Sequence, residues 1–356
     1  MTPRERVLAV LHGEMPDRIP FTSYACLVPQ GEVQLRLGNE GLALIHHCPV
    51  FATERPHVQV ECHEYSENGG SFLRETFRTP IGEVWQTWRT GGAYGSRRLR
   101  EYLIKQPEDY QVVKFMVRDE VYTPTYDEFL TAQDNLGEAG VVFGGWLPRS
   151  PLTYMLWELL SHEQFAVDYY ERPDEFLSLH ETIAERRREQ FAIAAASPAL
   201  VLHMGDNITA DMIGRERFAR YCVPCYNEFA SYLHPEGKLL AVHMDGLTRV
   251  LADAVAASDV DIVEAFCAVP DGDLELAEAR RVWAEKIIWT NYPSPVHLWS
   301  PDKIEAYTRQ ILHDIAPGDR FLVGITENVP EDVAQISLPI ISRVLKKEGI
   351  LPLSAQ

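Results

Sequence analysis

Hydrophobic and polar positions follow two different periods along the chain. Between residues 56 and 105, apolar and polar residues alternate, cleanly at 57–62 and less cleanly at 73–79, on either side of Gly69-Gly70. Alternation with a period of two around glycine turns is typical of antiparallel hairpins with one exposed face. We therefore predict a β-hairpin insertion at 56–105 within a single domain that spans residues 1–356.

From about residue 140, short apolar runs alternate with helical patterns. The predicted strands are 141–146, 199–204, 238–243, 261–266, 287–290 and 320–324, and the predicted helices are 151–161, 174–196, 215–234, 247–257, 274–284, 301–315 and 331–348. A short helix ending at Gly13 and a strand that begins near Ile19 precede the hairpins. Such alternation implies parallel strands joined by crossover helices, and so many repeats favour a closed (β/α)8 TIM barrel over an open sheet.

Polar residues end several of the predicted strands, which is where TIM barrels carry their chemistry. His243 ends one strand, Glu264 lies inside the apolar run 262–266, and Glu327 follows the last strand. A carboxylate inside an apolar strand is costly to bury unless it is paired or bound to a cation. Because zinc accepts imidazole and carboxylate ligands, these residues indicate a divalent-metal site. The alternative is a hydrogen-bonded histidine with carboxylates that serve as caps or salt-bridge partners.

Composition and charge exclude several classes of partner. The formal net charge is −19, and such an acidic surface repels nucleic acid. No apolar run approaches the ~20 residues of a membrane span, and residues 1–6 contain no apolar signal region. The six cysteines are scattered without the spacing of a disulfide framework. We therefore expect a cytoplasmic protein with no membrane partner.

Three further motifs favour structural interpretations. Cys222-Val223-Pro224-Cys225 lies within a predicted helix and has no second cysteine pair nearby, so we expect structural cysteines. His46-His47-Cys48 resembles a metal motif, but adjacent histidines of a helix point apart, and we expect only local structure there. Gly144-Gly145 lacks the flanking pattern of a phosphate-binding loop.

Several segments together resemble the uroporphyrinogen-decarboxylase-like superfamily. They are residues 1–7 with 16–20, residues 149–153 followed by 170–174, residues 237–246, and residues 324–332. The resemblance runs over nearly the whole chain, and the order and spacing of these segments are more specific than any one of them. It implies a TIM-barrel enzyme and two candidate chemistries, decarboxylation and methyl transfer.

The early part of the chain disfavours decarboxylation. The resemblance implies that a uroporphyrinogen decarboxylase would hold substrate carboxylates with paired arginines near the first strand. The matching stretch, 18–27, lacks those arginines. Decarboxylation stays an alternative, as does a non-catalytic binding module that kept the barrel.

The methyltransferase branch of the superfamily implies a zinc site. Its members bind zinc through a His-x-Cys pair, often a glutamate, and a distant cysteine. The matching residues here are His243, Glu264 and Glu327, with Asp245 as a further candidate, so carboxylates occupy both cysteine positions. Oxygen ligands leave a harder metal that polarises an ether or alcohol oxygen. We therefore expect demethylation of a small methoxylated substrate, such as an aryl methyl ether.

The resemblance also implies the methyl acceptor, and positions along the chain suggest further site residues. The acceptor would be a Co(I) corrinoid (cobalamin) carried by a partner protein, although free cobalamin or a thiol stays open, as does a monomer or a homodimer. Asp206 and Asn207 end a strand and are expected to contact substrate or assist proton transfer. The residues expected to bind substrate are His203, Phe21, Tyr24 and Trp146, with Trp85 and Trp88 as further aromatic candidates. For each aromatic residue, ordinary packing is the alternative.

Overall fold

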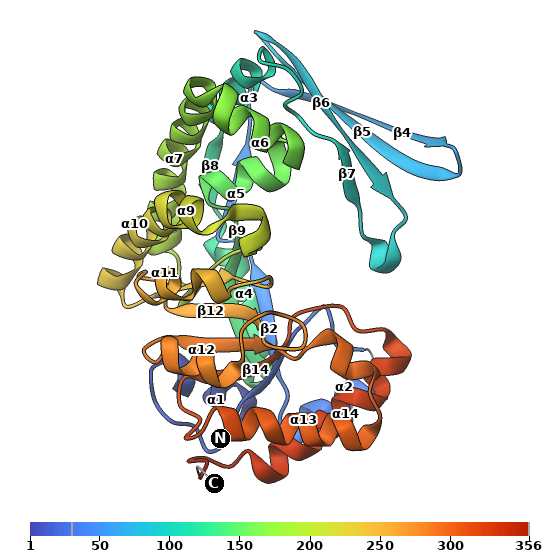
Figure 1. Ribbon diagram of the computed structural model, residues 1–356, viewed down its shortest axis with the longest axis vertical. Helices are drawn as coiled ribbons and strands as arrows, with labels where there is room; N and C mark the ends of the chain where they lie inside the picture. Colours follow the sequence, from blue (N-terminus) through green and yellow to red (C-terminus); the bar gives the residue numbers. More distant parts are fainter. Residues whose placement is uncertain (30, 355–356) are drawn as a thin grey trace. The chain divides into compact units, whose positions relative to one another are not determined.

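The protein is described here by a computed structural model that covers residues 1–29 and 31–354 (Figure 1). The chain separates into two compact units, and each is described by itself. The first unit contains Met1–Val50, Thr125–Leu147 and the chain from Ala194 onward. The second contains Phe51–Pro124 and Pro148–Ile193.

The first unit is built around a closed barrel of eight parallel strands. Their order around the barrel is β1-β14-β13-β12-β11-β10-β9-β2. The strands are β1 (Phe21–Tyr24), β2 (Ala43–Cys48), β9 (Gly140–Leu147), β10 (Val201–Met204), β11 (Leu239–His243), β12 (Ile262–Cys267), β13 (Ile287–Asn291) and β14 (Phe321–Ile325). The predicted (β/α)8 architecture is therefore confirmed.

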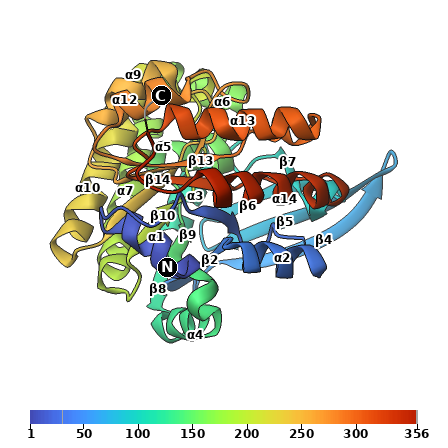
Figure 2. The same cartoon turned by 90° about the horizontal axis from the view of Figure 1, so that it is seen from below.

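Helices cover the outside of this barrel. They are α1 (Pro3–Leu11), α2 (Glu32–Glu40), α4 (Tyr126–Leu136), α8 (Ala210–Ile213), α9 (Arg215–Arg217), α10 (Val223–Leu233), α11 (Ala252–Ala256), α12 (Leu276–Val282), α13 (Pro301–Asp314) and α14 (Glu331–Glu348). A reciprocal capping box between Thr2 and Glu5 begins α1. Figure 2 shows α14 between α13 and α2, and α14 packs against both.

One segment of the first unit differs from its prediction. Residues 46–48 form the end of strand β2, so the prediction of a helix there was wrong. In a strand, successive side chains point to opposite faces. His46 is accordingly exposed, whereas His47 is half-buried and contacts Phe143 inside the barrel.

The second unit contains the predicted hairpins. Strands β4 (Gln59–Glu67), β5 (Gly70–Thr79), β6 (Gly82–Thr90) and β7 (Arg98–Glu101) form an antiparallel sheet, and β3 (Phe51–Glu54) pairs with β8 (Val121–Pro124). The helices of this unit are α3 (Asp109–Arg118), α5 (Pro151–Tyr154), α6 (His162–Glu171) and most of α7 (Pro173–Ala196). Helix α3 packs on β5 and β6, where Phe77 and Val84 are buried.

No helix in the described part of the chain combines the length and the apolar character needed to cross a membrane.

Candidate functional site

The candidate site is centred on a buried imidazole–carboxylate pair. His243 ends β11, Glu264 lies on the adjacent strand β12, and the two residues are register partners. The distance from His243 Nδ1 to Glu264 Oε2 is 2.6 Å. The hydroxyl of Tyr24, on β1, donates to Glu264 Oε1 at 2.6 Å. Both oxygens of the buried carboxylate therefore have a polar partner.

The direction of Glu264 depends on an irregularity in β12. The strand register shifts between Val263 and Phe266, and Ala265 has a φ of 55°. Bulges of this kind are common beside active sites, where they redirect a side chain. A positive φ is also uncommon for alanine, so the surrounding structure holds this backbone in a strained conformation.

Two more histidines extend the cluster. His203, on β10, is fully buried, and its Nδ1 lies 2.9 Å from His47 Nε2. Its Nε2 lies 2.9 Å from Glu264 Oε2 but forms no aligned hydrogen bond. The prediction that placed His46-His47-Cys48 outside the site was therefore wrong for His47. The sequence did contain a signal for His47. Residues 43, 45 and 47 lie on the same face of a strand, and Ala43 and Ile45 are apolar and buried, so the side chain of His47 also points into the barrel.

Electrostatics favour an ion pair at the centre of this cluster. Burial alone would lower the pKa of His243, but the carboxylates of Glu264 and Asp245 outweigh burial and raise that pKa to about 10. Burial would raise the pKa of Glu264, but the imidazoles of His243 and His203 hold it well below its usual range. Burial and the neighbouring His203 lower the pKa of His47 to about 2, so His47 stays neutral.

A second set of potential ligands lies on the other side of the His243 ring. His243 Nε2 is 3.5 Å from Asp245 Oδ2, and one ligand atom from each of His243, Asp245 and Glu327 lies within 4.8 Å of the others. Burial and the negative charge of Asp245 raise the pKa of Glu327. A cation bound beside Glu327 would offset this unfavourable environment for its charge, so the raised pKa of Glu327 fits a cation site.

One ligand atom from each of His203, His243 and Glu264 also lies within 4.8 Å of the others. The structure therefore brings together every residue predicted to bind metal, but in two sets that share His243. The unaligned Nε2 of His203 is a buried polar atom that a cation would also satisfy. Imidazole nitrogens and carboxylate oxygens are ligands that zinc accepts, so either set fits a zinc ion.

The loop after β10 places Asp206 and Asn207 beside these groups. Asp206 is fully buried, and its Oδ2 accepts a hydrogen bond from Tyr226 on α10 at 2.6 Å. Asn207 has a φ of 50°, and its Nδ2 donates to Asp245 Oδ2 at 3.4 Å. Asn207 thus contacts a candidate ligand directly. The catalytic roles predicted for Asp206 and Asn207 stay predictions.

Trp146 provides an exposed aromatic surface at the site. Its side chain is 49% exposed and stacks on His47 with 4.6 Å between ring centroids. Its ring also lies 5.6 Å from the rings of Tyr24 and His243. A Cβ on Gly205 would approach the Trp146 ring to 2.8 Å, so the neighbouring backbone leaves space for this ring only because residue 205 is glycine.

The other predicted aromatic residues lie elsewhere. Phe21 is buried at the amino end of β1, three residues before Tyr24. Trp85 and Trp88 belong to β6 of the second unit. There they make cation–π contacts with Lys105 and Arg97, respectively. Their predicted substrate contacts stay predictions.

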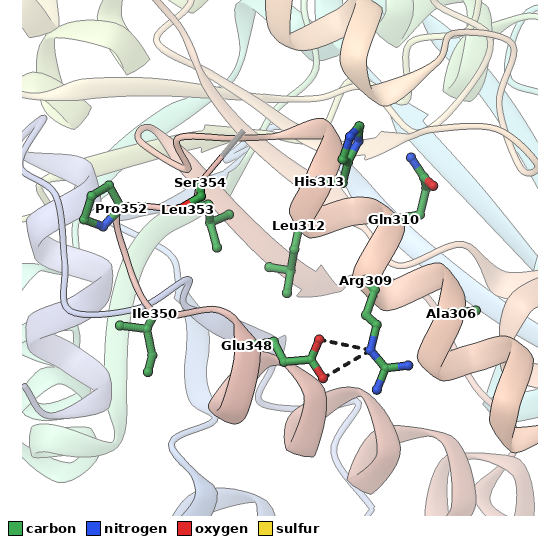
Figure 3. A pocket seen from close by; sticks show the side chains of 10 residues that line it. All are labelled: Ala306, Arg309, Gln310, Leu312, His313, Glu348, Ile350, Pro352, Leu353 and Ser354. Carbon is green, nitrogen blue, oxygen red and sulfur yellow. Dashed lines mark hydrogen bonds and ion pairs between the residues drawn. The ribbon is translucent and has the colours of Figure 1, made fainter. Parts of the chain in front are cut away.

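A separate cavity of about 570 Å³ lies between α13, the end of α14 and the C-terminal segment (Figure 3). Arg309 and Glu348 form an ion pair across it, at 2.9 Å. Because Gln310, His313 and Glu348 lie near the carboxyl ends of their helices, the cavity is at the end of the barrel where the strands begin. In TIM barrels, that end contributes to stability rather than to catalysis.

Comparisons with known proteins agree with this architecture. The uroporphyrinogen decarboxylase (URO-D) family profile matches residues 128–335, which is more than half of the chain. No curated protein matches the sequence significantly. Among the 26 solved chains that match, a methyltransferase from Methanosarcina mazei is 13% identical, with a TM-score of 0.56 over 96% of this chain and 99% of that chain. At this identity, the likeness concerns the fold alone. Because the family profile matches most of the chain, the protein belongs to the uroporphyrinogen decarboxylase (URO-D) family.

Proposed function

We propose that the protein is a zinc-dependent methyltransferase that demethylates a small methoxylated substrate, such as an aryl methyl ether. A reduced corrinoid carried by a partner protein would accept the methyl group. The observation that carries the proposal is the grouping of His243, Asp245 and Glu327 beside the exposed ring of Trp146. The similarity in fold to a protein named as a methyltransferase is consistent with this proposal.

Within this proposal, His243, Asp245 and Glu327 are the zinc ligands. A histidine ligand commonly donates its other ring N–H to a carboxylate, which fixes the tautomer and the ring orientation. Glu264 is placed for that role, because its Oε2 lies 2.6 Å from His243 Nδ1 and leaves Nε2 for the metal. The earlier prediction of Glu264 as a direct ligand is the competing hypothesis, with His203 and His243 as its companions.

Zinc bound there would act as a Lewis acid that polarises the ether oxygen of the substrate. The residues around it bind and orient. Trp146 presents a flat ring on which an arene can stack, and its contact with His47 fixes that ring. Burial and the carboxylate of Glu264 raise the pKa of Tyr24 well above its usual value. The Tyr24 hydroxyl therefore stays protonated and donates a hydrogen bond to Glu264 Oε1. Asn207 Nδ2 donates a hydrogen bond to Asp245 Oδ2 and so orients this proposed ligand.

Decarboxylation is less consistent with these contacts. In the described residues, no arginine forms a hydrogen bond or an ion pair with His243, Asp245 or Glu264. A polycarboxylate substrate would instead meet carboxylates at the site. The contacts therefore favour a neutral or weakly charged substrate.

Metal analysis tests the zinc site. We expect close to stoichiometric zinc in the purified protein and its loss in His243→Ala and Asp245→Asn. His313→Ala is the matched control, because His313 is an exposed histidine of α13, and it should retain zinc. Negligible zinc in the wild-type protein, after refolding or dialysis with zinc, would refute the site.

Methyl transfer tests the reaction separately. The zinc-loaded protein would be incubated with a panel of methoxyarenes and a Co(I) corrinoid protein, and formation of methylcorrinoid and of the phenol would be measured. Both products should appear in equal amounts. Retained zinc with no methyl transfer to any corrinoid would point instead to a binding module.

A further inference from the structure

The antiparallel sheet of the second unit ends in a cavity that the candidate site does not include. Its volume is about 430 Å³. Three arginines, three hydroxyl residues and four glycines line it: Arg89, Arg97, Arg98, Ser71, Thr90, Ser96, Gly69, Gly70, Gly91 and Gly92. No acidic residue is among these lining residues, although the chain as a whole has a net charge of −19. We name this cavity the sheet-end pocket.

Two of the arginines face each other directly. Arg89 on β6 and Arg98 on β7 are register partners in the antiparallel ladder. Like charges in directly opposite positions of a sheet destabilise it. Both side chains are exposed, and neither forms an ion pair with a described residue. Among residues 1–29 and 31–354, these two positive charges therefore lie together without a counter-ion.

The third arginine is held in position by its neighbours. The guanidinium of Arg97 lies 4.3 Å from the ring centroid of Trp88. Trp88 is fixed in turn, because its Nε1 donates to Glu75 Oε2 at 2.7 Å. Gln86 donates to that same oxygen, also at 2.7 Å. Stacking on a fixed ring orients the planar guanidinium and reduces the entropy lost when it binds a ligand.

We propose that the sheet-end pocket binds the phosphate group of a small phosphorylated ligand. Guanidinium groups bind phosphate oxygens in pairs of parallel hydrogen bonds, and the three positive charges here exceed the two negative charges of a phosphate dianion. The hydroxyls of Ser71, Thr90 and Ser96 add donors to the same cavity. Its volume exceeds that of a lone phosphate and falls in the range of small-molecule sites, roughly 300–1,000 Å³. Phosphate binding in this pocket does not depend on the proposed methyl transfer; only the corrinoid, as one source of the phosphate, rests on that proposal.

Two sources of such a phosphate are compatible with the pocket. One is a free phosphate ester or diphosphate. The other is the phosphodiester in the nucleotide loop of a corrinoid. Both offer anionic phosphate oxygens to the arginines, but the diester carries one negative charge and a phosphate monoester about two. The test therefore uses a simple probe first and separates the sources afterwards.

Calorimetry with inorganic pyrophosphate, at constant ionic strength in chloride, tests the proposal. We compare the wild-type protein with the double variant Arg89→Ser/Arg98→Ser and with Arg100→Ser. Arg100 is an exposed residue of the same strand β7 but lies outside the lining, so it controls for the loss of a nearby charge.

Pyrophosphate should bind the wild type, and the double variant should bind at least about tenfold more weakly, because it lacks two of the three guanidinium groups that line the pocket. Arg100→Ser should stay within about twofold of the wild type. The midpoint of thermal unfolding and the circular dichroism spectrum confirm that each variant is folded. No measurable binding to the wild type, or an equal loss in both variants, would overturn the proposal.

A competition experiment then identifies the source. Cyanocobalamin contains the nucleotide loop, whereas dicyanocobinamide lacks it. Displacement of pyrophosphate by cyanocobalamin alone assigns the pocket to a corrinoid. Displacement by neither compound assigns it to a free phosphorylated ligand.

Discussion

Replacement of Glu264 by glutamine separates the two ligand assignments. Glutamine keeps the size of the side chain and removes its charge. In the wild type, Glu264 accepts from Tyr24, pairs with His243 and faces His203, and all three distances are 2.6–2.9 Å. If Glu264 only orients His243, loss of this outer carboxylate should weaken zinc binding about 10- to 100-fold. That range corresponds to about 1.4–2.8 kcal/mol.

In the metal-free protein, the same substitution should also lower the free energy of unfolding. Removing one partner of a buried ion pair typically costs about 3–5 kcal/mol of folding free energy, because the other charge is left buried and unpaired. His243 can release its proton in the variant, so the loss should fall toward the lower end of that range. Urea unfolding of the metal-free wild type and of Glu264→Gln would measure it.

The decisive assay is zinc affinity, measured by competition with a chromophoric chelator. Glu264→Gln should weaken binding less than Glu327→Gln or Asp245→Asn, because the last two remove proposed ligands. If Glu264→Gln weakens zinc binding as strongly as Glu327→Gln does, Glu264 is itself a ligand and our assignment is refuted. Unchanged urea unfolding would refute the buried ion pair.

The remaining predictions concern pH and the aromatic surface. In the metal-free protein the pKa of His243 is raised to about 10. The contribution of protonated His243 to the free energy of unfolding is therefore fully present below pH 6.5 and is lost as the pH rises toward 10. Urea unfolding across this pH range should show this loss in the wild type and a weaker pH dependence in Glu264→Gln. Trp146→Ala should raise the KM for a methoxyarene about 3- to 10-fold while Trp146→Phe retains most affinity, since an aromatic contact contributes about 0.5–1.5 kcal/mol; equal KM values in all three proteins would refute stacking. Gly205→Ala should raise KM similarly, because the new Cβ displaces the Trp146 ring, without loss of zinc; a crystal structure with an unmoved ring would contradict this.

Most of the barrel could be predicted from the sequence for a physical reason. Strands of a parallel barrel are buried on both faces, so they appear as continuous apolar runs, and β12 at Ile262–Cys267 is an example. Strand β2 was missed because two histidines interrupt its apolar pattern near the carboxyl end. His46 is exposed to solvent and His47 contacts His203 in the site, so neither position carries an apolar core side chain.

The candidate site could be predicted in its members but not in its geometry. Polar residues in or just after the predicted strands identified His243, Glu264 and Glu327 as candidates. Spacing along the chain could not reveal that Glu264 contacts Nδ1 of His243 while Asp245 lies near Nε2, because the order of residues does not show which ring nitrogen each carboxylate approaches. Nor could spacing show that Asp245 joins Glu327.

The order of strands around the barrel also has a consequence for synthesis. The first strand, β1, pairs with the last, β14, which ends at Ile325, and Glu327 follows it. A nascent chain on the ribosome therefore carries an open barrel edge at β1 until β14, at Phe321–Ile325, has been translated. Glu327 joins His243 only after that closure, so the proposed zinc site is completed late in folding. Chains that end before residue 325 would present an unpaired strand to other molecules and would lack a complete site, which makes them natural targets for chaperones and proteases.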